Sequence, residues 1–564
     1  MAGNILTPVT LWSEFKTDKV PECTVIDSRQ EDGVLFIRCY IEGRKVGDER
    51  VKIFTTIAKG VQTSVAPAIL LIRDFIDGDY NQMICDLVNK GYTVVMPDLA
   101  GKVDDKEFYT EYPLEISYAN FMQVKDDLYS VVNEVSQTCW YEWGCVARYV
   151  IEYLKNSGTV TGIGGLGIAE AATVLWQTAA MEESVLCSAF VMNAGWSGYR
   201  GIHKYGGQVE PQFSDSMYKF IAGVDPQTYA KHINSPVLIL SATNSDKFDC
   251  DRAYDTVVRM GENVYKAIHY SVGYRNKVSE EGYNDAVIFF DEFLKRNGKQ
   301  RKNLPDESEI KVDFENGKMR VVITPDEKNL KEVALFVSEE TTAPSERCWF
   351  KVTDYVEKTE DGYVFEYQPY YNSGIVTFFT KAYYKSGFVI GSNIVAKKFD
   401  ADQTFKGYRS NVLYSSRMQS SESIFSAANQ IENSPEHVNV SGGQRIKVLR
   451  GPMGIDGAYC EWGLLTFKIN ATKDKPNPDA MFMLDVYTKE DNVVTIKLIT
   501  DYYGKKSEYV ANVSLCGGDV WHNVKLEKSK FKTAEGMSLK SYDKVNAIEF
   551  NANGTWLINN ALWV

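Results

Sequence analysis

The sequence predicts a multidomain protein in which a mostly parallel sheet covered by helices is followed by two all-β sandwich domains. With 564 residues, the chain is too long for a single hydrophobic core. Up to about residue 300, continuous apolar strands alternate with helical patterns, which is typical of a parallel sheet covered on both faces. Beyond residue 303 the helical periodicity disappears, and short alternating strands recur between turn signals.

The first 300 residues supply the elements of this parallel sheet in order. Residues 23–57 alternate as paired strands before the first helix. Apolar strands are then expected at residues 68–72, 92–96, 160–163, 186–192, 236–240 and 264–270. Helices are expected at residues 82–90, 146–154, 169–180 and 283–295. The run from 296 to 303 is polar and basic, and we interpret it as a linker.

The remaining residues predict two all-β regions. Short strands at residues 319–323, 333–337, 348–352, 363–367, 375–383 and 388–397 indicate a sandwich of immunoglobulin or fibronectin type. A second all-β block follows from about residue 407, and its longer strands are typical of a jelly roll. We therefore expect three domains, at residues 1–300, 308–400 and 407–564.

Charge and composition exclude several classes of protein. The formal net charge of −13 argues against partners such as nucleic acid or an anionic membrane, which bind surfaces rich in lysine and arginine. No apolar run approaches the roughly 20 residues that span a bilayer. Residues 1–21 lack the apolar core of a signal peptide, so we expect a cytoplasmic location, or secretion if a leader has been removed. The ten cysteines show no metal-ligand spacing and only five histidines are present, so we predict free thiols, no metal site and no cofactor.

Several segments of the first 300 residues resemble the α/β-hydrolases related to acetyl xylan esterases and dienelactone hydrolases. They are residues 91–98 (GYTVVMPD), 225–230 (DPQTYA) and 235–244 (SPVLILSATN), together with the last amphipathic helix at 283–295. The resemblance implies an α/β-hydrolase fold for residues 1–300. It also implies a catalytic triad of nucleophile, acid and histidine.

Each implied triad position carries an unsuitable residue. The stretch 161–170 (TGIGGLGIAE) stands where the nucleophile turn is expected, which places Leu166 at the nucleophile position, or Gly164 if the frame shifts by two. The acid position falls at Ser245, with Asp246 one place later, and Asn276 stands where the histidine is expected. Neither leucine nor glycine can attack a carbonyl, and asparagine cannot act as a base. We therefore expect no catalytic residues at this site.

Two other residues are candidates for a nucleophile and a base. Ser197 follows a strand end but lacks the turn spacing, so a polar turn serine is the alternative interpretation. His269 lies within a strand, where the alternative is a packed or hydrogen-bonded histidine. Arg73 and Asp74 stand at the start of the oxyanion loop, where bulky charge disfavours a pair of N–H donors. The acidic cluster, defined as Asp246, Asp249, Asp251 and Asp255, either holds a cation or begins a helix.

The last 150 or so residues resemble the jelly-roll carbohydrate-binding modules of glycan-degrading enzymes. Residues 520–526 (VWHNVKL), 545–550 (VNAIEF) and 555–563 (TWLINNALW) carry this resemblance. Sugar binding needs exposed aromatic faces, for which Tyr502, Tyr503 and Trp462 are the candidates, with Tyr459 and Asp501 beside them. Trp521, Trp556 and Trp563 fit the core of the strands better. The alternative is a module that only packs on its neighbours.

Two functions remain open at this point. The first is a catalytically degenerate α/β-hydrolase homologue that binds a ligand, with a carbohydrate or acylated glycan expected, or serves as a scaffold. The second is a carbohydrate esterase, a carboxylic ester hydrolase with a non-standard nucleophile such as Ser197. A deep cleft would favour ligand binding and a filled cleft would favour scaffolding. The oligomeric state is not predicted.

Overall fold

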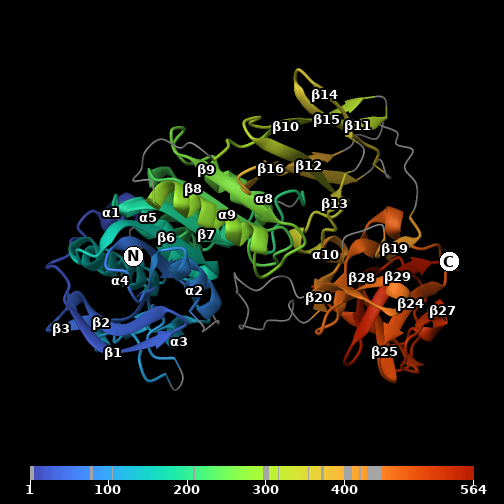
Figure 1. Cartoon of the computed structure of the whole chain (residues 1–564), viewed down its shortest axis with the longest axis horizontal. Helices are drawn as coiled ribbons and strands as arrows, with labels where there is room; N and C mark the ends of the chain where they lie inside the picture. The colour runs from blue at the N-terminus through green and yellow to red at the C-terminus, as the bar shows by residue number, and fades with distance from the viewer. Residues whose placement is uncertain are drawn as a thin grey trace.

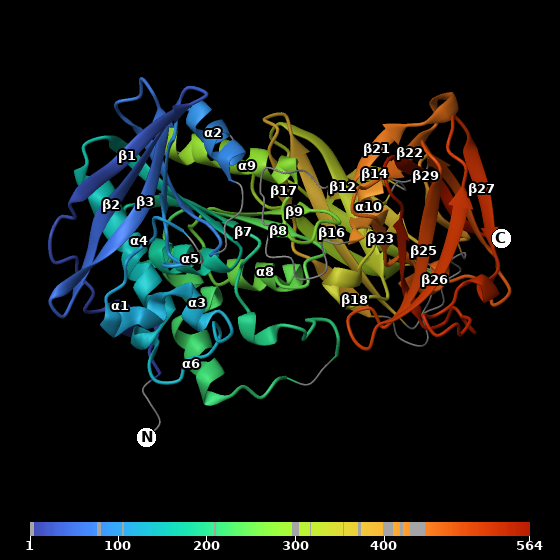
Figure 2. The same ribbon diagram turned by 90° about the horizontal axis from the view of Figure 1, so that it is seen from below.

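The computed structural model describes residues 5–75, 80–103, 106–207, 210–295, 304–315, 317–352, 355–369, 374–398, 410–417, 421–428 and 446–564. We call residues 5–295 the N-terminal part, 304–398 the middle part and 410–564 the C-terminal part. The three parts follow one another along the long axis of the molecule (Figures 1 and 2). The expected linker at 296–303 and the expected domain boundaries at residues 300, 400 and 407 lie outside the described residues.

The N-terminal part contains the predicted, mostly parallel sheet. Its strand order is β1-β2-β3-β5-β4-β6-β7-β8-β9, antiparallel from β1 to β5 and parallel from β5 to β9. The bounds are β1 Cys23–Glu31, β2 Val34–Val46, β3 Glu49–Gly60, β4 Ala66–Ile72, β5 Thr93–Pro97, β6 Val160–Ile168, β7 Val185–Val191, β8 Val237–Ala242 and β9 Lys266–Ser271. This arrangement is α/β-hydrolase-like.

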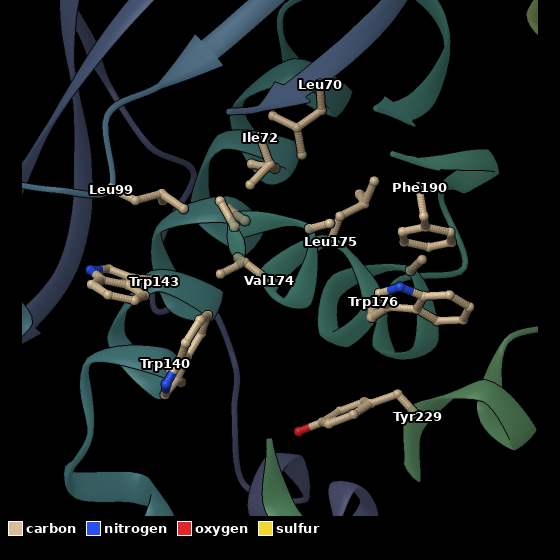
Figure 3. Packing of buried hydrophobic residues seen from close by; sticks show 14 of the residues in the cluster. Leu70, Ile72, Leu99, Trp140, Trp143, Val174, Leu175, Trp176, Phe190 and Tyr229 are labelled. Atoms are coloured by element: carbon tan, nitrogen blue, oxygen red, sulfur yellow. The ribbon is translucent and has the colours of Figure 1, made fainter. Parts of the chain in front are cut away.

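Helices cover both faces of this sheet, which is why its strands are apolar throughout. One face is covered by α4 (Cys139–Asn156), α5 (Ala172–Met181) and α8 (Cys250–Val257). The other face is covered by α2 (Asn81–Asn89) and α9 (Glu280–Phe290). Figure 3 shows the first of these cores, where the rings of Trp176 and Phe190 stack with centroids 3.8 Å apart. Trp176 also donates its indole N–H to the carbonyl of Asn193 at 3.0 Å, so its one polar atom is satisfied.

The large sheet continues from the N-terminal part into the middle part. Strand β17 (Val389–Gly391) pairs with β9 through Gly391 and Ile268, and β16, β12 and β13 follow. A side chain at Gly391 would meet the ring of Tyr270 at 2.5 Å, so this close approach requires glycine. The middle strands are β10 Glu309–Glu315, β11 Lys318–Thr324, β12 Leu330–Glu339, β13 Phe350–Lys351, β14 Tyr355–Thr359, β15 Gly362–Tyr367, β16 Ile375–Tyr384 and β18 Val395–Lys398.

The middle part has a hydrophobic cluster of its own. Strands β10, β11, β15 and β14 form a separate four-stranded sheet, and its residues Val321 and Phe365 share the cluster with Val337 and Phe378 of β12 and β16. The expected strand at 348–352 is reduced to the two residues of β13. Every strand pair in the described middle part is antiparallel, as the alternating pattern of the sequence predicts.

The C-terminal part consists of two further sheets around one core. The first contains β19 Val412–Ser415, β21 Lys447–Arg450, β22 Asp456–Tyr459, β24 Phe482–Thr488, β27 Trp521–Leu526 and β29 Trp556–Trp563. The second contains β20 Ser426–Ala427, β23 Leu464–Thr466, β25 Asn492–Thr500, β26 Ser507–Leu515 and β28 Val545–Asn551. Trp556 and Trp563 are buried in the shared core, as expected. Among the described residues, no helix has both the length and the apolar character required to cross a bilayer.

Candidate functional site

The carboxyl ends of the parallel strands meet at one edge of the sheet, where an α/β fold places its functional loops. Strand β6 runs through Ile168, and the turn into the next helix begins at Ala169, which has a positive φ of 49°. A positive φ is uncommon for a residue with a side chain, and it marks the strained strand-to-helix turn that carries the nucleophile in hydrolases of this fold. The residue at the apex of the turn is therefore Ala169, whose side chain is a methyl group.

The expected nucleophile positions lie too early in the chain. Leu166 is inside β6, only 1% exposed, and packs in the core on the side of α2 and α9. Gly164 is also inside the strand, where a side chain would meet Leu294 at 2.8 Å. The turn lies three residues beyond Leu166. The sequence does carry a signal for it. A side chain at Gly167 would meet Cα of Ala172 at 2.9 Å, so β6 requires glycine there, and residues 167–171 (GIAEA) have small residues at the first, third and fifth positions, as such turns do.

Charged side chains surround this turn. Glu170, the residue after Ala169, forms an ion pair with Arg200, whose guanidinium lies 4.3 Å from the ring centroid of Tyr129. Asp74 follows β4, and burial together with the charge of Glu170 raises its pKa to about 6. The backbone N–H of Phe75 donates to the Asp74 carboxylate at 2.9 Å. An N–H of this loop is thus occupied by an acidic side chain, which disfavours binding of an oxyanion.

The acid and base positions do not assemble a catalytic pair either. Asp246 follows β8, is exposed, and lines a small cavity together with Trp196, Arg200 and His203. The volume of this cavity is about 30 Å³, which is the space of a single water molecule. Asn276 lies in the turn after β9, as expected, and an amide cannot act as a base. The space beside Asp246 is therefore small, whereas a second cavity at this edge, lined by Arg73 after β4 and by Asp98 after β5, has a volume of about 540 Å³.

The hydroxyl of Ser197 forms a hydrogen bond with a carboxylate and not with a histidine. Its hydroxyl donates to Oδ1 of Asp225 at 3.1 Å, and its backbone N–H donates to Oδ2 at 3.0 Å. Asp225 also accepts from Gln227, and burial raises its pKa to about 6. Within the described part of the chain, no hydrogen bond or ion pair that we identify joins Ser197 to a histidine. This arrangement corresponds to the polar turn serine of the alternative interpretation.

His269 is buried within β9 and hydrogen-bonded at both ring nitrogens. Its Nδ1 lies 2.6 Å from Oδ2 of Asp285 in α9, and its Nε2 lies 3.4 Å from Oγ of Ser279. The backbone N–H of Val389 donates to the other oxygen of Asp285 at 3.0 Å, which ties the middle part to this pair. Burial lowers the pKa of His269 and raises that of Asp285, so the histidine is neutral. Sequence reasoning missed Ser279 and Asp285, since only the fold brings them to His269.

The aspartates of the acidic cluster make different structural contacts. Asp249 is the N-cap of α8 and accepts from the backbone N–H of Asp251 at 2.8 Å. Asp251 is buried and forms two hydrogen bonds of 2.6 and 2.7 Å with the guanidinium of Arg347 from the middle part. Asp255 pairs with Lys204 at 2.7 Å. The expectation that the cluster begins a helix is thus right for Asp249. The carboxylate of Asp251 is not solvated, because the guanidinium of Arg347 lies where a cation would bind it.

The expected sugar-binding aromatics are mostly engaged in packing. Tyr502 is only 8% exposed and packs edge-on against Phe467, so it presents no free face. Tyr503 is 42% exposed, but its ring stacks on Phe467 and its hydroxyl accepts from Nη1 of Arg275 in the N-terminal part at 2.8 Å. Trp462 is half-buried against the C-terminal core. The expectation of a stacking platform is therefore wrong for Tyr502, and Tyr503 joins two parts of the molecule.

Comparisons with solved structures find proteins that are similar to about half of this chain. No family model and no curated protein sequence matches the chain. Among solved structures, acetyl xylan esterase 1 from Thermoanaerobacterium sp. is 16% identical, with 49% of this chain and 88% of that chain covered and a TM-score of 0.35. Acetyl xylan esterase from Paenibacillus sp. R4 is 10% identical, with 51% and 92% covered and a TM-score of 0.39. A dienelactone hydrolase from Klebsiella pneumoniae is 13% identical, with 47% and 100% covered and a TM-score of 0.32.

Proposed function

We propose that this chain is a catalytically inactive α/β-hydrolase homologue that serves as a binding or scaffolding protein. The observation that carries the proposal is Ala169 at the positive-φ turn, where the fold requires a nucleophile and the chain offers a methyl group. Covalent acyl transfer needs an oxygen or sulfur nucleophile at this position and a base beside it. Asn276 supplies no base, and Glu170 with Asp74 brings negative charge to the place where an oxyanion would form.

The small space beside Asp246 favours a role in which this side of the N-terminal part acts as a rigid support. Its volume of about 30 Å³ is far below the 300–1,000 Å³ of a ligand pocket, whereas the cavity beside Arg73 has about 540 Å³. The middle part also contacts this edge, because Arg347 binds Asp251 and its carbonyl accepts from Asn244 at 2.5 Å. We therefore place ligand binding away from Asp246. A carbohydrate or acylated glycan is the ligand class we propose, because residues 520–526 and 555–563 resemble carbohydrate-binding modules.

The two β regions are proposed to be modules of a multidomain binding protein. The middle part fits an immunoglobulin-like sandwich, and the C-terminal part fits a jelly roll of the carbohydrate-binding type. Their paired sheets, each pair around one hydrophobic cluster, support this assignment. The cytoplasmic location expected from the sequence stays a prediction, as does the absence of nucleic acid and membrane partners.

Inactivity is tested with a fluorophosphonate probe and with p-nitrophenyl acetate. We expect no labelled peptide and no turnover above the rate of the heat-denatured protein, since no activated serine stands at the turn. A purified serine esterase carried through the same assay is the positive control. Labelling together with turnover, mapped to one serine by mass spectrometry, would contradict the proposal and identify the true nucleophile.

A carboxylic ester hydrolase that uses Ser279 is the second candidate. Ser279, His269 and Asp285 are connected in the order of a serine-hydrolase triad, with 3.4 Å between Ser279 Oγ and His269 Nε2. In such a reaction the serine oxygen attacks the ester carbonyl, the histidine takes the serine proton and gives it to the departing alcohol, and water then hydrolyses the acyl-enzyme. Against this candidate, Ser279 is the N-cap of α9 and accepts from the N–H of Gly282 at 3.2 Å.

The same probe separates the two candidates. If Ser279 is the nucleophile, Ser279→Ala abolishes labelling and turnover, whereas Ser197→Ala leaves both unchanged. The Ser197 variant is the matched control because the hydroxyl of Ser197 donates to the buried Asp225, whereas Ser279 lies beside His269. Labelling that survives Ser279→Ala would remove this candidate.

A further inference from the structure

Two cysteines on neighbouring strands lie next to each other on the face of the sheet that α4 covers. Cys23 begins the edge strand β1, and Cys39 lies in β2. The register places Cys23 opposite Ile41 and Val25 opposite Cys39, so the two cysteines are diagonal neighbours on one face. Side chains at this spacing come within reach of each other in a twisted antiparallel pair. The two thiols are hydrogen-bonded to each other, and both are free in this structure.

The backbone around the pair favours a bridge between the strands. The N–H of Glu42 donates to the carbonyl of Glu22 at 3.0 Å, so the next pair along, which contains Cys23, is a non-hydrogen-bonded pair. Side chains lie closest together at such positions. Strand β1 stands at the end of the sheet and pairs on one side only. It can therefore shift by the small distance that takes two sulfur atoms from contact to a bond of about 2.0 Å.

The surroundings give the two thiols different roles. Cys23 is half-buried, so a small oxidant can reach its sulfur. Hydrogen bonds from Cys39 and from Tyr153 of α4 lower the pKa of the Cys23 thiol, and the thiolate is the form that reacts. Cys39 is 0% exposed, and the carbonyl of Thr55 lies 3.5 Å from its sulfur as a second acceptor. Cys39 is therefore shielded from solvent, while its sulfur stays beside that of Cys23.

We propose that a peroxide converts Cys23 and Cys39 to a reversible disulfide that joins β1 to β2. The Cys23 thiolate attacks one oxygen of the peroxide, the O–O bond breaks, and the hydroxide that leaves takes up the proton that Cys23 released. Cys23 is then a sulfenic acid. The Cys39 sulfur attacks the Cys23 sulfur, the S–O bond breaks, and the departing hydroxide takes the Cys39 proton. Two thiols thus lose two electrons and two protons, and hydrogen peroxide becomes two water molecules.

The cysteine pair is separate from the hydrolase turn. Strands β3, β5 and β4 lie between β2 and β6, and the turn at Ala169 follows β6. Oxidation of the pair therefore requires neither an active nor an inactive hydrolase site. The bridge would close the hairpin between residues 23 and 39 and fix the outermost strand to its neighbour, and a thiol reductant would release it.

The test is peptide mapping under non-reducing conditions after the full chain has been treated with an equimolar amount of hydrogen peroxide. We expect a linked pair of peptides that contain Cys23 and Cys39, with the loss of two of the ten thiols. Dithiothreitol should restore both thiols. Cys145 is the internal control, because it is buried in the same core and should keep its thiol.

Three variants separate a specific disulfide from general oxidation. Cys39→Ser should abolish the linkage and leave a sulfenic acid at Cys23 that dimedone labels, because the second sulfur is missing. Cys23→Ser should leave Cys39 unmodified, because solvent does not reach it. Cys516→Ser is the matched control, since Cys516 is exposed in the C-terminal part, and its loss should leave the linkage unchanged.

The circular dichroism spectrum of each variant shows whether the fold is intact, and serine at the half-buried Cys23 should leave it unchanged. Absence of the Cys23–Cys39 peptide pair in the oxidised parent protein would overturn the proposal. Oxidation of Cys23 to a sulfinic acid without the linkage, or linkage of Cys23 to another cysteine, would overturn it as well. Fluorophosphonate labelling, in contrast, would overturn only the inactivity of the hydrolase part.

Discussion

Replacing Arg347 with methionine should lower the free energy of unfolding by about 3–5 kcal/mol, the cost of breaking a buried ion pair from one side. The structure supports the upper part of this range. The guanidinium makes hydrogen bonds of 2.6 and 2.7 Å to Asp251, and both side chains are fully buried. Arg347 also donates to the carbonyls of Thr341 and Thr342, each at 3.2 Å. Methionine leaves the Asp251 carboxylate buried beside Asp249, whose pKa is already raised to about 7 by burial and by the charge of Asp251.

The assay is urea unfolding followed by tryptophan fluorescence, because the ring of Trp349 lies 5.5 Å from this guanidinium. The double variant Arg347→Met, Asp251→Leu removes the stranded charge and should recover at least half of the loss. Lys351→Met is the control, since Lys351 pairs with Glu332 at 2.5 Å on the surface and should cost less than about 1 kcal/mol. A loss below about 1 kcal/mol for Arg347→Met, or no recovery in the double variant, would refute this reasoning.

Two other predictions concern the turn and the buried aspartate. Ala169→Ser should restore neither fluorophosphonate labelling nor turnover of p-nitrophenyl acetate, because no base stands beside the new hydroxyl; a rate more than about tenfold above that of the parent protein would show a base that we have missed. Asp225 has its pKa raised from 3.8 to about 6 by burial, so its neutral form favours the folded state. Its contribution of about 3 kcal/mol is present below pH 4 and is lost as the pH rises through 6. Asp225→Asn should therefore flatten the dependence of stability on pH between 4 and 6, whereas the control Asp246→Asn, at an exposed residue, should not. Equal slopes of stability against pH for the parent protein and both variants would contradict the pKa assignment.

The sheet could be predicted because its strands are defined by local patterns. Strand β4 consists of apolar residues that are buried on both faces, and β8 has the same character. The length of β6 could not be predicted in this way. Its last seven residues are the glycine-rich run GIGGLGI, which has weak strand propensity. Gly165 and Gly167 are nevertheless required there, because the side chain of Leu175 packs directly on them. The turn was therefore expected three residues too early.

The contacts that define the sites are all distant in sequence. Arg347 and Asp251 are 96 residues apart, and His269 and Asp285 belong to a strand and a helix that meet only in the folded sheet. The unsuitable residue types at Leu166 and Asn276 could be predicted, because they depend on single positions of the sequence. The contacts of Ser279 with His269 could not, since they depend on how a strand and a helix pack.

The positive φ of Ala169 has its cause in the packing around the turn. A positive φ costs alanine roughly 1 kcal/mol or more relative to glycine, so the local sequence alone does not favour this conformation. Packing enforces it, because Gly167 of β6 lies against Ala172 and Leu175 of α5, and the chain must reverse between them within a few residues. The strained turn is thus a property of the contact between strand and helix, not of the nucleophile. The contact does not depend on the side chain at the apex, and the Glu170–Arg200 ion pair begins at the very next residue.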